Sequence, residues 1–579
     1  MTPALSAVRR HGELDLAAKL VLAAGALVAV YLIAAPLAML LLTAVRGPAD
    51  ALPFEQGAQW TLEHFRAIYS DSVLYTRIIP DTLVFVLGSV ALCFVIAFTL
   101  AWLVERTDLP WRDLWFSLIL FPLLVPSVVL AIAWIFLLGP NAGWMNVWLR
   151  SLFGLEGTGP LNIFSMPGLV ACQALALVPF VFLLLGATLR SMNPALEEAS
   201  STSGASPAAT FLRVTVRVLL PGVLAPLILA LLITLEQFDL PLIIGLPARI
   251  NVFSYRIWYE LTPSSGLPNY GGAAAVGLPF LVVAMLLLVV YNWLIRRAES
   301  FVTVTGKAYR QTRFPLGRWR IPALAFVVAY VMLAAVLPTL VLLWSALFGY
   351  APPALDSLGK ISLAAYGKLA GNRLFWLGLG NTLLVATLSA LIVTTVGAVL
   401  AWIIVRTRFT GRRFLDFVSF MSVGIPSVIT ALAVMVLYLS MPVGIYGTVW
   451  ILVVAYSYRL AVTTRISRAG LMQIHRELEE ASSTSGARWL STQRRILLPL
   501  LMPTLVSGFI LLFITGVREF TMGLMLYGQD NVVLSVLLWR LFESGEAAAS
   551  AALATIIIAL VIPIVFIARR YLSPRGYAD

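Results

Sequence analysis

The sequence predicts an all-α integral membrane protein with about 12 transmembrane helices, arranged as two parallel repeats of six helices. The chain of 579 residues is 60% hydrophobic and only 12% charged, and its mean hydropathy is +0.94, unlike the balance of a soluble domain. In addition, the same short motifs recur at fixed offsets in the two halves of the chain. Recurrence of this kind indicates an internal repeat.

Twelve apolar windows are long enough to cross a hydrocarbon core of about 30 Å as helices. The first half contains windows near residues 18–45, 81–104, 114–138, 166–189, 218–245 and 273–295. The second half contains windows near 321–347, 381–405, 414–439, 443–464, 499–527 and 547–568. The first apolar run, of about 25 residues, is too long for the core of a cleaved signal peptide, so we expect a retained helix.

Basic residues gather beside the ends of the predicted spans, on one side of the membrane. The formal net charge is +13, but no soluble domain holds a basic surface, so we interpret the charge as membrane topology and expect no nucleic-acid partner. The positive-inside rule then places both termini, the linker 296–320 and the loops 197–221 and 479–499 in the cytoplasm. The pattern includes Arg106, Arg112, Arg190, Arg296, Arg297, Lys307, Arg406, Arg465, Arg495 and Arg569.

The two halves of the chain resemble each other at matched positions. Four short motifs recur 300 residues apart, whereas the nonapeptide EEASSTSGA recurs 282 residues apart. The difference of 18 residues places an insertion in the first half, and we assign it to the loop Gly139–Ser165, whose counterpart Ser440–Gly447 is much shorter. The recurring motifs are Asp81-Thr82-Leu83 with Asn381-Thr382-Leu383, Ala101-Trp102 with Ala401-Trp402, Arg106-Thr107 with Arg406-Thr407, and Pro126-Ser127-Val128 with Pro426-Ser427-Val428.

An even number of spans in each half gives both halves the same orientation in the membrane. We therefore expect a first half at 1–295, a basic cytoplasmic linker at 296–320 and a second half at 321–579. Pro126 and Pro426 each lie within an apolar window and predict helix kinks. A static kink and a moving gate are both compatible with this pattern.

The duplicated nonapeptide occupies Glu197–Ala205 and Glu479–Ala487. Acidic residues open each copy, small residues follow, and a glycine permits a tight reversal before an apolar and basic segment. The pattern predicts two short helices joined by a turn, which we call the elbow. Because its side chains are small, an elbow on the cytoplasmic side lets another protein approach the backbone closely.

The elbow resembles the EAA loop of binding-protein-dependent ABC importer permeases, which would make the fold similar to a type I ABC importer. The resemblance implies a bacterial inner-membrane permease with two separate ATPase subunits, a periplasmic substrate-binding protein and the lipid bilayer as partners. The second copy matches the family pattern fully, whereas the first has Arg217 where the family has proline. The residues that would couple to the ATPase are Glu198, Ala199 and Gly204 in the first elbow, and Glu480, Ala481 and Gly486 in the second.

Two fused six-span halves also resemble the iron(III)-type permeases within this group. The motif Val517-Arg518-Glu519-Phe520 in the eleventh window and the segment Leu534–Ala547 carry this resemblance. It implies iron(III) as the substrate, while thiamine, phosphonates and polyamines stay open because related permeases carry them.

We expect no catalytic site, cofactor or resident metal in this chain. A P-loop needs a glycine, four residues, and then Gly-Lys-Ser or Gly-Lys-Thr, and the Gly-Lys pairs at Lys307, Lys360 and Lys368 do not fit this pattern. ATP hydrolysis is therefore expected on separate subunits. Three histidines in all, without a paired cluster, offer no nucleophile and base arrangement.

A secondary transporter of the major facilitator type is the competing class of protein, because it also has two parallel six-span halves. Such a carrier needs no matched pair of docking loops. It usually has a basic motif between its second and third spans, which Glu105-Arg106-Thr107-Asp108 matches poorly. The duplicated elbow therefore favours the ABC permease.

Charged residues in the fifth and eleventh windows are candidates for the translocation path. Burying an ionisable group at membrane depth costs at least about 2.5 kcal/mol, so such groups usually face a cavity or a partner. Two interpretations remain open: an outer gate lined by carboxylates, and a fixed ion pair between Glu236 and Arg518. The candidate residues are Glu236, Asp239, Arg518 and Glu519.

Overall fold

The computed structural model describes residues 16–191, 199–200, 202–263, 266–299, 313–349 and 359–572. Within these ranges the chain consists of helices and loops, with one small antiparallel sheet in which β1 (Arg46–Gly47) pairs with β2 (Gln59–Trp60). Seven helices there are long and apolar enough to cross a membrane, and three pairs of helices pass the same test together with a bend. The described residues also contain two shorter apolar helices, Ser427–Leu439 and Ala547–Pro563, and these spans confirm the predicted all-α membrane fold.

The chain packs as two compact units, which we call unit one and unit two. Unit one comprises Met1–Leu62, Trp376–Val533 and Leu560–Asp579, and unit two comprises Glu63–Phe375 and Leu534–Ala559. The long helix α27 (Ala547–Leu572) contributes to both.

The helices of unit two include most of the first half of the chain. They are α3 (Glu63–Ser70), η1 (Leu74–Ile78), α4 (Ile79–Arg106), α5 (Arg112–Leu120), η2 (Phe121–Leu124), α6 (Ser127–Leu138), α7 (Trp144–Phe153), α8 (Met166–Ser191), α10 (Pro207–Thr210), η3 (Phe211–Thr215), α11 (Val216–Leu235), η4 (Pro241–Gly245), α12 (Phe253–Leu261), α13 (Tyr270–Glu299), η5 (Gly317–Trp319), α14 (Arg320–Val331), η6 (Met332–Val336), α15 (Leu337–Phe348), α16 (Ala364–Ala370) and α26 (Leu534–Glu543).

The helices of unit one include most of the second half of the chain. They are α2 (Leu16–Val45), α17 (Arg373–Arg406), α18 (Arg412–Met421), α19 (Ser427–Leu439), α20 (Val449–Tyr456), α21 (Leu460–Gln473), α22 (Glu477–Thr484), α23 (Trp489–Thr492), η8 (Gln493–Leu497), α24 (Leu498–Arg518) and α25 (Thr521–Met525).

The first span of each half packs against later spans of the other half. In unit one, α2 contacts α18 and α19, and Gly25 lets it approach α17 because a Cβ there would lie 2.6 Å from Val399 Cγ1. In unit two, α14 contacts α5, and α15 contacts α6. The division of the chain at 295 and 320 follows the sequence repeat and stays a prediction. The two spatial units do not follow this division, because the first span of each half belongs to the unit that holds most of the other half.

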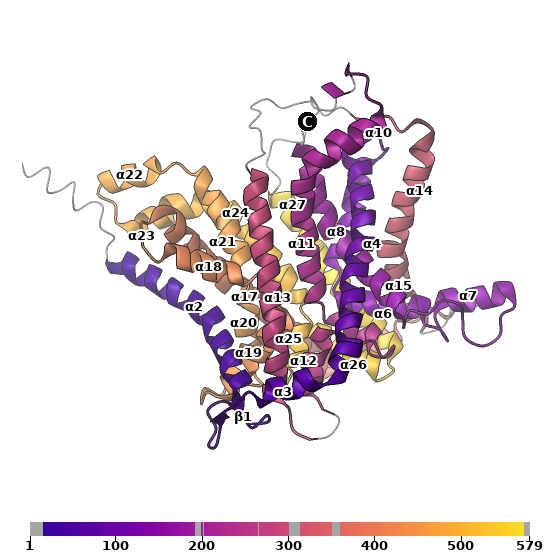
Figure 1. The fold of residues 1–579 in the computed structure, drawn as a ribbon, viewed down its shortest axis with the longest axis horizontal. Coiled ribbons are helices and arrows are strands. Elements are labelled where there is room, and N and C mark those ends of the chain that lie inside the picture. The colour runs from indigo at the N-terminus through magenta and orange to yellow at the C-terminus, as the bar shows by residue number, and fades with distance from the viewer. Residues whose placement is uncertain are drawn as a thin grey trace, which may run out of the picture. The chain divides into compact units, whose positions relative to one another are not determined.

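The core of unit two lies between α4 and α8, which run side by side over most of their length (Figure 1). Leu100 of α4 and Phe182 and Leu185 of α8 are fully buried there, and Tyr330 of α14 joins the same cluster. Burial of this kind gives the long, uniformly apolar helices a buried face as well as the face that meets lipid.

The two repeated prolines break their helices with the same backbone conformation. Pro126 has φ −57° and ψ 143°, and Pro426 has φ −59° and ψ 143°. Each precedes the first residue of a helix, α6 or α19, where a missing backbone N–H carries no penalty. The segments Arg112–Leu124 and Ser127–Leu138 meet at 100°. The predicted kinks are therefore confirmed, and they are full breaks.

Candidate functional site

The second elbow is a short helix that ends in a glycine turn. Helix α22 has acidic residues in its first turn and stops before Gly486, whose φ is +80°. Gly486 N–H donates to Ser483 O at 3.0 Å, and Ala487 N–H donates to Ser482 O at 3.2 Å. These two bonds form a Schellman motif, which satisfies the last carbonyls of a helix and requires a left-handed residue. Two short helices joined by a turn, as predicted, are present as α22 (Glu477–Thr484) and α23 (Trp489–Thr492).

The first elbow repeats this turn. Gly204 has φ +83°, and Ala205 N–H donates to Ser200 O at 3.2 Å. Ser200 and Thr210 share a hydroxyl hydrogen bond of 2.8 Å, and 282 residues later Ser482 and Thr492 share one of the same length. Glu198 lies outside the described residues, while Ala199 is exposed. The duplicated sequence therefore produces a duplicated local structure, in which a hydroxyl pair joins the two arms of each elbow.

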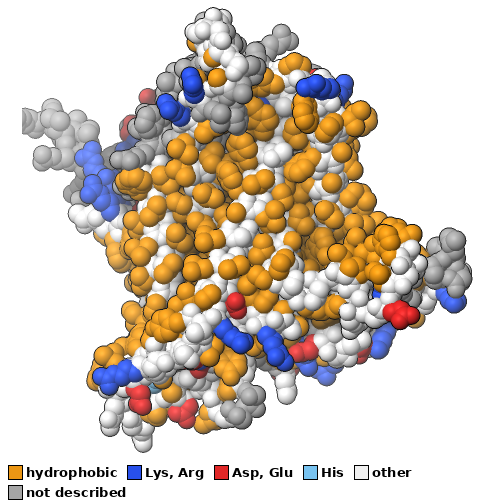
Figure 2. All heavy atoms as spheres, turned by 45° about the vertical axis from the view of Figure 1, so that its right-hand side comes forward, with side chains coloured by type: hydrophobic (Ala, Val, Ile, Leu, Met, Phe, Trp, Pro, Cys, Tyr) orange, Lys and Arg blue, Asp and Glu red, His pale blue; other side chains and the backbone are white. Residues whose placement is uncertain are grey.

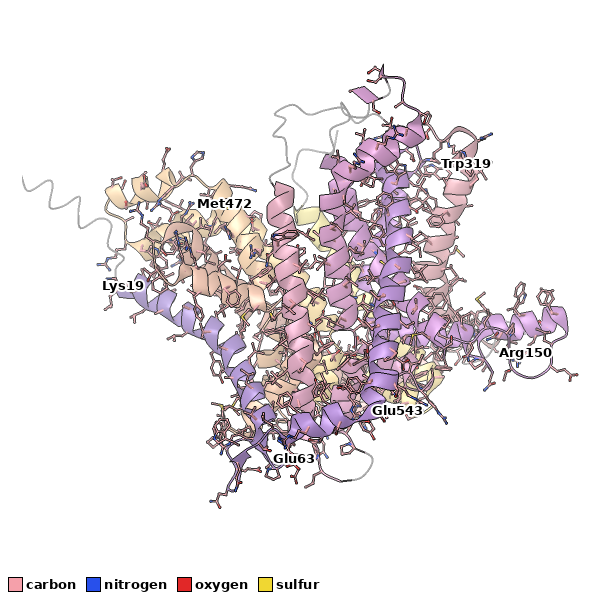
Figure 3. All side chains as sticks on the ribbon, in the orientation of Figure 1. Lys19, Glu63, Arg150, Trp319, Met472 and Glu543 are labelled. Carbon is pink, nitrogen blue, oxygen red and sulfur yellow. The ribbon has the colours of Figure 1, made fainter. Side chains whose placement is uncertain are left out.

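The outward side of the second elbow is small, acidic and exposed. The Glu480 side chain is 66% exposed, and its Oε1 lies 3.6 Å from Nε of Arg476. Ala481, Ser485 and Gly486 are also exposed, and Met472 projects nearby (Figure 3). A Cβ built on Gly486 would meet no atom within 4 Å. The surface is thus open to the close approach of another protein.

Glu479, which the sequence reasoning did not select, fixes the elbow to helix α17. Its Oε1 lies 2.7 Å from Arg406 Nε, and the two side chains are 16% and 10% exposed. Trp402 Nε1 donates to Glu479 Oε2 at 3.4 Å, and the Trp402 ring meets that of Trp489 edge-on. Arg406 also donates to the carbonyl of Ile474 at 2.8 Å. The sequence did mark the two partners of Glu479, because Trp402 and Arg406 belong to the motifs that recur 300 residues apart.

A comparable basic residue is buried at the end of α4 in unit two. The Arg106 guanidinium lies over the rings of Trp102 and Phe314, 5.8 and 5.7 Å from their centroids. Its carbonyl accepts a hydrogen bond of 2.9 Å from Phe314 N–H. The matched Trp-Arg positions therefore hold the chain at the ends of α4 and α17.

The acidic candidates in the fifth and eleventh windows lie where helices end. Helix α11 ends at Leu235, immediately before Glu236, and α24 ends at Arg518, immediately before Glu519. The chain resumes in η4 and α25 respectively. We predicted continuous spans at 218–245 and 499–527, and the structure divides each of them. Broken membrane helices expose polar backbone that binds substrates and ions in many transporters.

In unit one Glu519 is held by Arg459, which the sequence reasoning missed. The carboxylate forms an ion pair with the Arg459 guanidinium, which also donates to Ser427 Oγ at 3.2 Å. Glu519 Oε1 accepts from Met522 N–H at 3.2 Å. Arg459 lies at the 49° bend between α20 and α21, within a window that we treated as plain apolar. Each residue of this cluster lies at a helix break: Ser427 at the start of α19, Arg459 between α20 and α21, and Glu519 directly after α24.

In unit two a different acid, Asp239, whose counterpart 282 residues later is Thr521, contacts a serine directly. Ser127 Oγ donates to Asp239 Oδ2, and Asp239 is buried. Nearby, Ser254 Oγ donates to the carbonyl of Gln237 at 2.7 Å. Ser127 and Ser427 are the repeated residues after Pro126 and Pro426, so both breaks present a hydroxyl to an acidic cluster. Glu236 and Arg518 belong to different units, and both interpretations of their relation stay predictions.

The repeated Asp-Thr and Asn-Thr motifs hold the segments that follow these breaks. Asp81 Oδ2 accepts from Asn251 N–H at 3.0 Å, and Thr82 Oγ1 accepts from Phe253 N–H at 3.1 Å. In unit one Asn381 Nδ2 donates to the carbonyl of Val532 at 2.9 Å. Among the described residues no group of three or more His, Cys, Asp or Glu side chains is arranged to hold a metal ion.

Comparisons with known proteins agree with this duplicated architecture. The family described as "Binding-protein-dependent transport system inner membrane component" matches residues 94–300 and 393–576, once in each half. Ferric transport system permease protein FbpB of Actinobacillus pleuropneumoniae is 26% identical over 84% of this chain and 70% of its own length. A putative ferric transport permease FbpB 1 of Haemophilus influenzae is 27% identical over 83% of this chain and 75% of its own length.

Among solved structures, a bacterial ABC transporter involved in the import of alginate covers 46% of this chain and all of its own, with 17% identity and a TM-score of 0.36. The repeated family match extends over most of the membrane segments. The chain therefore belongs to the binding-protein-dependent transport system inner membrane component family, and it is a multi-pass permease subunit of an ABC importer of the bacterial inner membrane.

Proposed function

We propose that this permease carries iron(III), delivered by a periplasmic binding protein. The observation that carries the proposal is its similarity to two ferric transport permeases over more than 80% of the chain. The carboxylates of Asp239 and Glu519 are oxygen donors, which suit hard cations. Family membership sets aside the major facilitator alternative. Thiamine, phosphonates and polyamines are the competing cargoes.

An uptake assay with four labelled cargoes tests this choice. A strain that lacks importers for these cargoes would express the chain with candidate binding-protein and ATPase partners, and would receive labelled iron(III), thiamine, 2-aminoethylphosphonate or spermidine. We expect energy-dependent accumulation of iron alone, lost when this chain is omitted. Accumulation of one of the other three in place of iron overturns the cargo but leaves the importer role intact.

We also propose that each elbow contacts one of two separate ATPase subunits. The exposed acidic helix α22 and the matched glycine turns at Gly204 and Gly486 support this role. Two equivalent turns fit two equivalent clefts on an ATPase dimer. The residues assigned to the contact are Glu198, Ala199 and Gly204, and Glu480, Ala481 and Gly486.

Charge reversal at the two elbows tests this contact. The double variant Glu198→Arg with Glu480→Arg should insert in the membrane but lose transport-coupled ATP hydrolysis. Glu156→Arg is a matched control, because Glu156 is an exposed acid in the loop after α7. Full coupling in the double variant, or equal loss in the control, contradicts the assignment.

We further propose that both termini, the linker 296–320 and both elbows lie in the cytoplasm. The basic residues beside the span ends support this orientation. A tag inserted near Lys307 should react only after cells are opened. Labelling of intact cells contradicts the orientation.

We propose finally that Glu236, Asp239, Arg518 and Glu519 border the translocation path. The helix ends at Glu236 and Glu519 support it, because broken spans surround substrate sites in transporters. Cysteines that replace Asp239 and Glu519 should react with a water-soluble thiol reagent in at least one nucleotide state. If neither cysteine reacts in any nucleotide state, these positions do not line the path. The exchange Glu236→Arg with Arg518→Glu distinguishes a clamp, which would regain transport, from a gate, which would assemble without it.

A further inference from the structure

Helix α7 belongs to a firmly built loop that the second half of the chain lacks. Asn146 is completely buried; its Nδ2 donates to Gly139 O at 2.9 Å and to Leu161 O at 2.7 Å, and its Oδ1 accepts from Leu161 N–H. Arg150 donates to Asn141 O at 2.6 Å and to Gly157 O at 2.7 Å. Both polar side chains therefore tie the following loop to one side of the helix.

The other side of α7 is apolar and exposed. Trp148 and Leu152 are 61% and 58% exposed. Trp144, Trp148 and Leu152 follow a four-residue spacing, so they share one face of the helix. At its start, the Trp144 ring meets Trp344 edge-on at 5.8 Å. The helix is thus amphipathic, with its polar side occupied by its own loop.

Helix α7 lies level with the ends of two membrane segments of unit two. Asn146 bonds the carbonyls of Leu138 and Gly139, where α6 ends. Trp344 lies in the last turn and a half of α15, and its ring stacks on Phe348. In Figure 1, α7 runs across the direction of α4 and α14 and extends away from them. Figure 2 turns this flank forward, and hydrophobic side chains continue across it, with charged groups below.

We propose that α7 is an interfacial helix that lies flat in the bilayer, with Trp148 and Leu152 among the acyl chains at the headgroup boundary. Tryptophan is enriched at this boundary, and amphipathic helices lie there with their apolar face inward. The apolar face of α7 continues the lipid-facing surface of the spans, and the Trp144, Trp344 and Phe348 rings mark the same level. Because the insertion is absent from the second half, it is separate from the duplicated machinery. The proposed topology makes this the outer leaflet.

Spin labels at paired positions test the proposal. In a chain carrying Cys93→Ala and Cys172→Ala, single cysteines replace Trp148 or Leu152 on the apolar face, and Glu156 or Thr158 in the exposed loop that is tied to the polar side. Each labelled protein is reconstituted in vesicles of phosphatidylethanolamine and phosphatidylglycerol. Collision with lipid-soluble oxygen is then compared with collision with a water-soluble nickel chelate.

We expect the ratio of oxygen to nickel collisions to be several-fold higher at 148 and 152 than at 156 and 158. Equal ratios at all four positions overturn the proposal. Protection of 148 and 152 that arises only when the binding protein is added also overturns it and makes α7 a protein-docking surface. The measurement needs neither transport nor ATP hydrolysis, so its failure is distinct from failure of the proposed function.

Discussion

Replacing Gly486 tests whether the shape of the elbow, and not only its charge, sets ATPase coupling. At φ +80° an L-residue with a Cβ is disfavoured by about 1–2 kcal/mol relative to glycine. No atom lies within 4 Å of the added Cβ, so contact with neighbours adds nothing to this cost. A penalty of about 1–2 kcal/mol lowers the equilibrium constant for forming the native turn roughly five- to thirty-fold.

The assay is the binding of the proposed ATPase subunits to the purified permease. Gly486→Ala should raise the half-saturating ATPase concentration by up to about thirty-fold, while the maximal coupled rate at saturation stays unchanged. Gly486→Asn is the matched control, because asparagine tolerates the left-handed conformation better than alanine. Gly204→Ala should behave like Gly486→Ala, since Gly204 has φ +83° and an equally open surrounding.

The ranking of the three residues at position 486 tests whether the backbone conformation is the cause. We expect the ATPase subunits to bind most tightly with glycine, less tightly with asparagine and least tightly with alanine. If asparagine and alanine are equally harmful, the added side chain obstructs the partner and the backbone argument is wrong. If alanine has no effect at Gly486 or at Gly204, the turn conformation does not limit coupling.

Three further predictions concern the residues that the structure added and the linker. Glu479→Gln should increase hydrogen exchange across the second elbow, because it weakens a charged contact of about 1.5–3 kcal/mol, whereas Glu480→Gln should leave exchange unchanged; equal effects contradict the anchoring role. Arg459→Leu should lower thermal stability and transport by leaving Glu519 buried without its cation, and adding Glu519→Gln should restore stability; no recovery means that the pair is not the cause. A chain divided near Lys307 and expressed as two pieces should still assemble and transport, and failure to copurify contradicts a dispensable linker.

The sequence predicted the elbow well because its determinants are local. A glycine that follows a short acidic helix specifies the turn through neighbouring residues alone. The assignment of Glu480 over Glu479 was less secure, because consecutive helical residues point about 100° apart. Which of the two faces inward depends on α17, more than seventy residues away. The only sign in the sequence that Glu479 is the inward residue is the recurrence of Trp402 and Arg406, which contact it.

The interior clusters were harder to predict because they depend on distant contacts. Arg459 and Glu519 are separated by 60 residues and by a long helix. Apolar windows identified the fifth and eleventh spans, but hydropathy does not locate a break inside a window. For α7, the four-residue spacing of Trp144, Trp148 and Leu152 was readable, and we had treated the segment only as an insertion.

The duplicated parts of this permease have diverged in different ways at its two kinds of site. The elbows share their turn conformation and their hydroxyl pair, bond for bond. The clusters at the helix breaks differ between the two halves. The position that corresponds to Arg459, 282 residues earlier, is the buried Leu177. Helix α8 is also continuous, whereas the corresponding helices α20 and α21 are bent. A partner with two equal clefts would keep two loops alike, whereas a single path enclosed by both halves does not require equal walls. The pattern of likeness and difference is therefore what we expect if the proposed elbow contacts and the proposed path residues are correct.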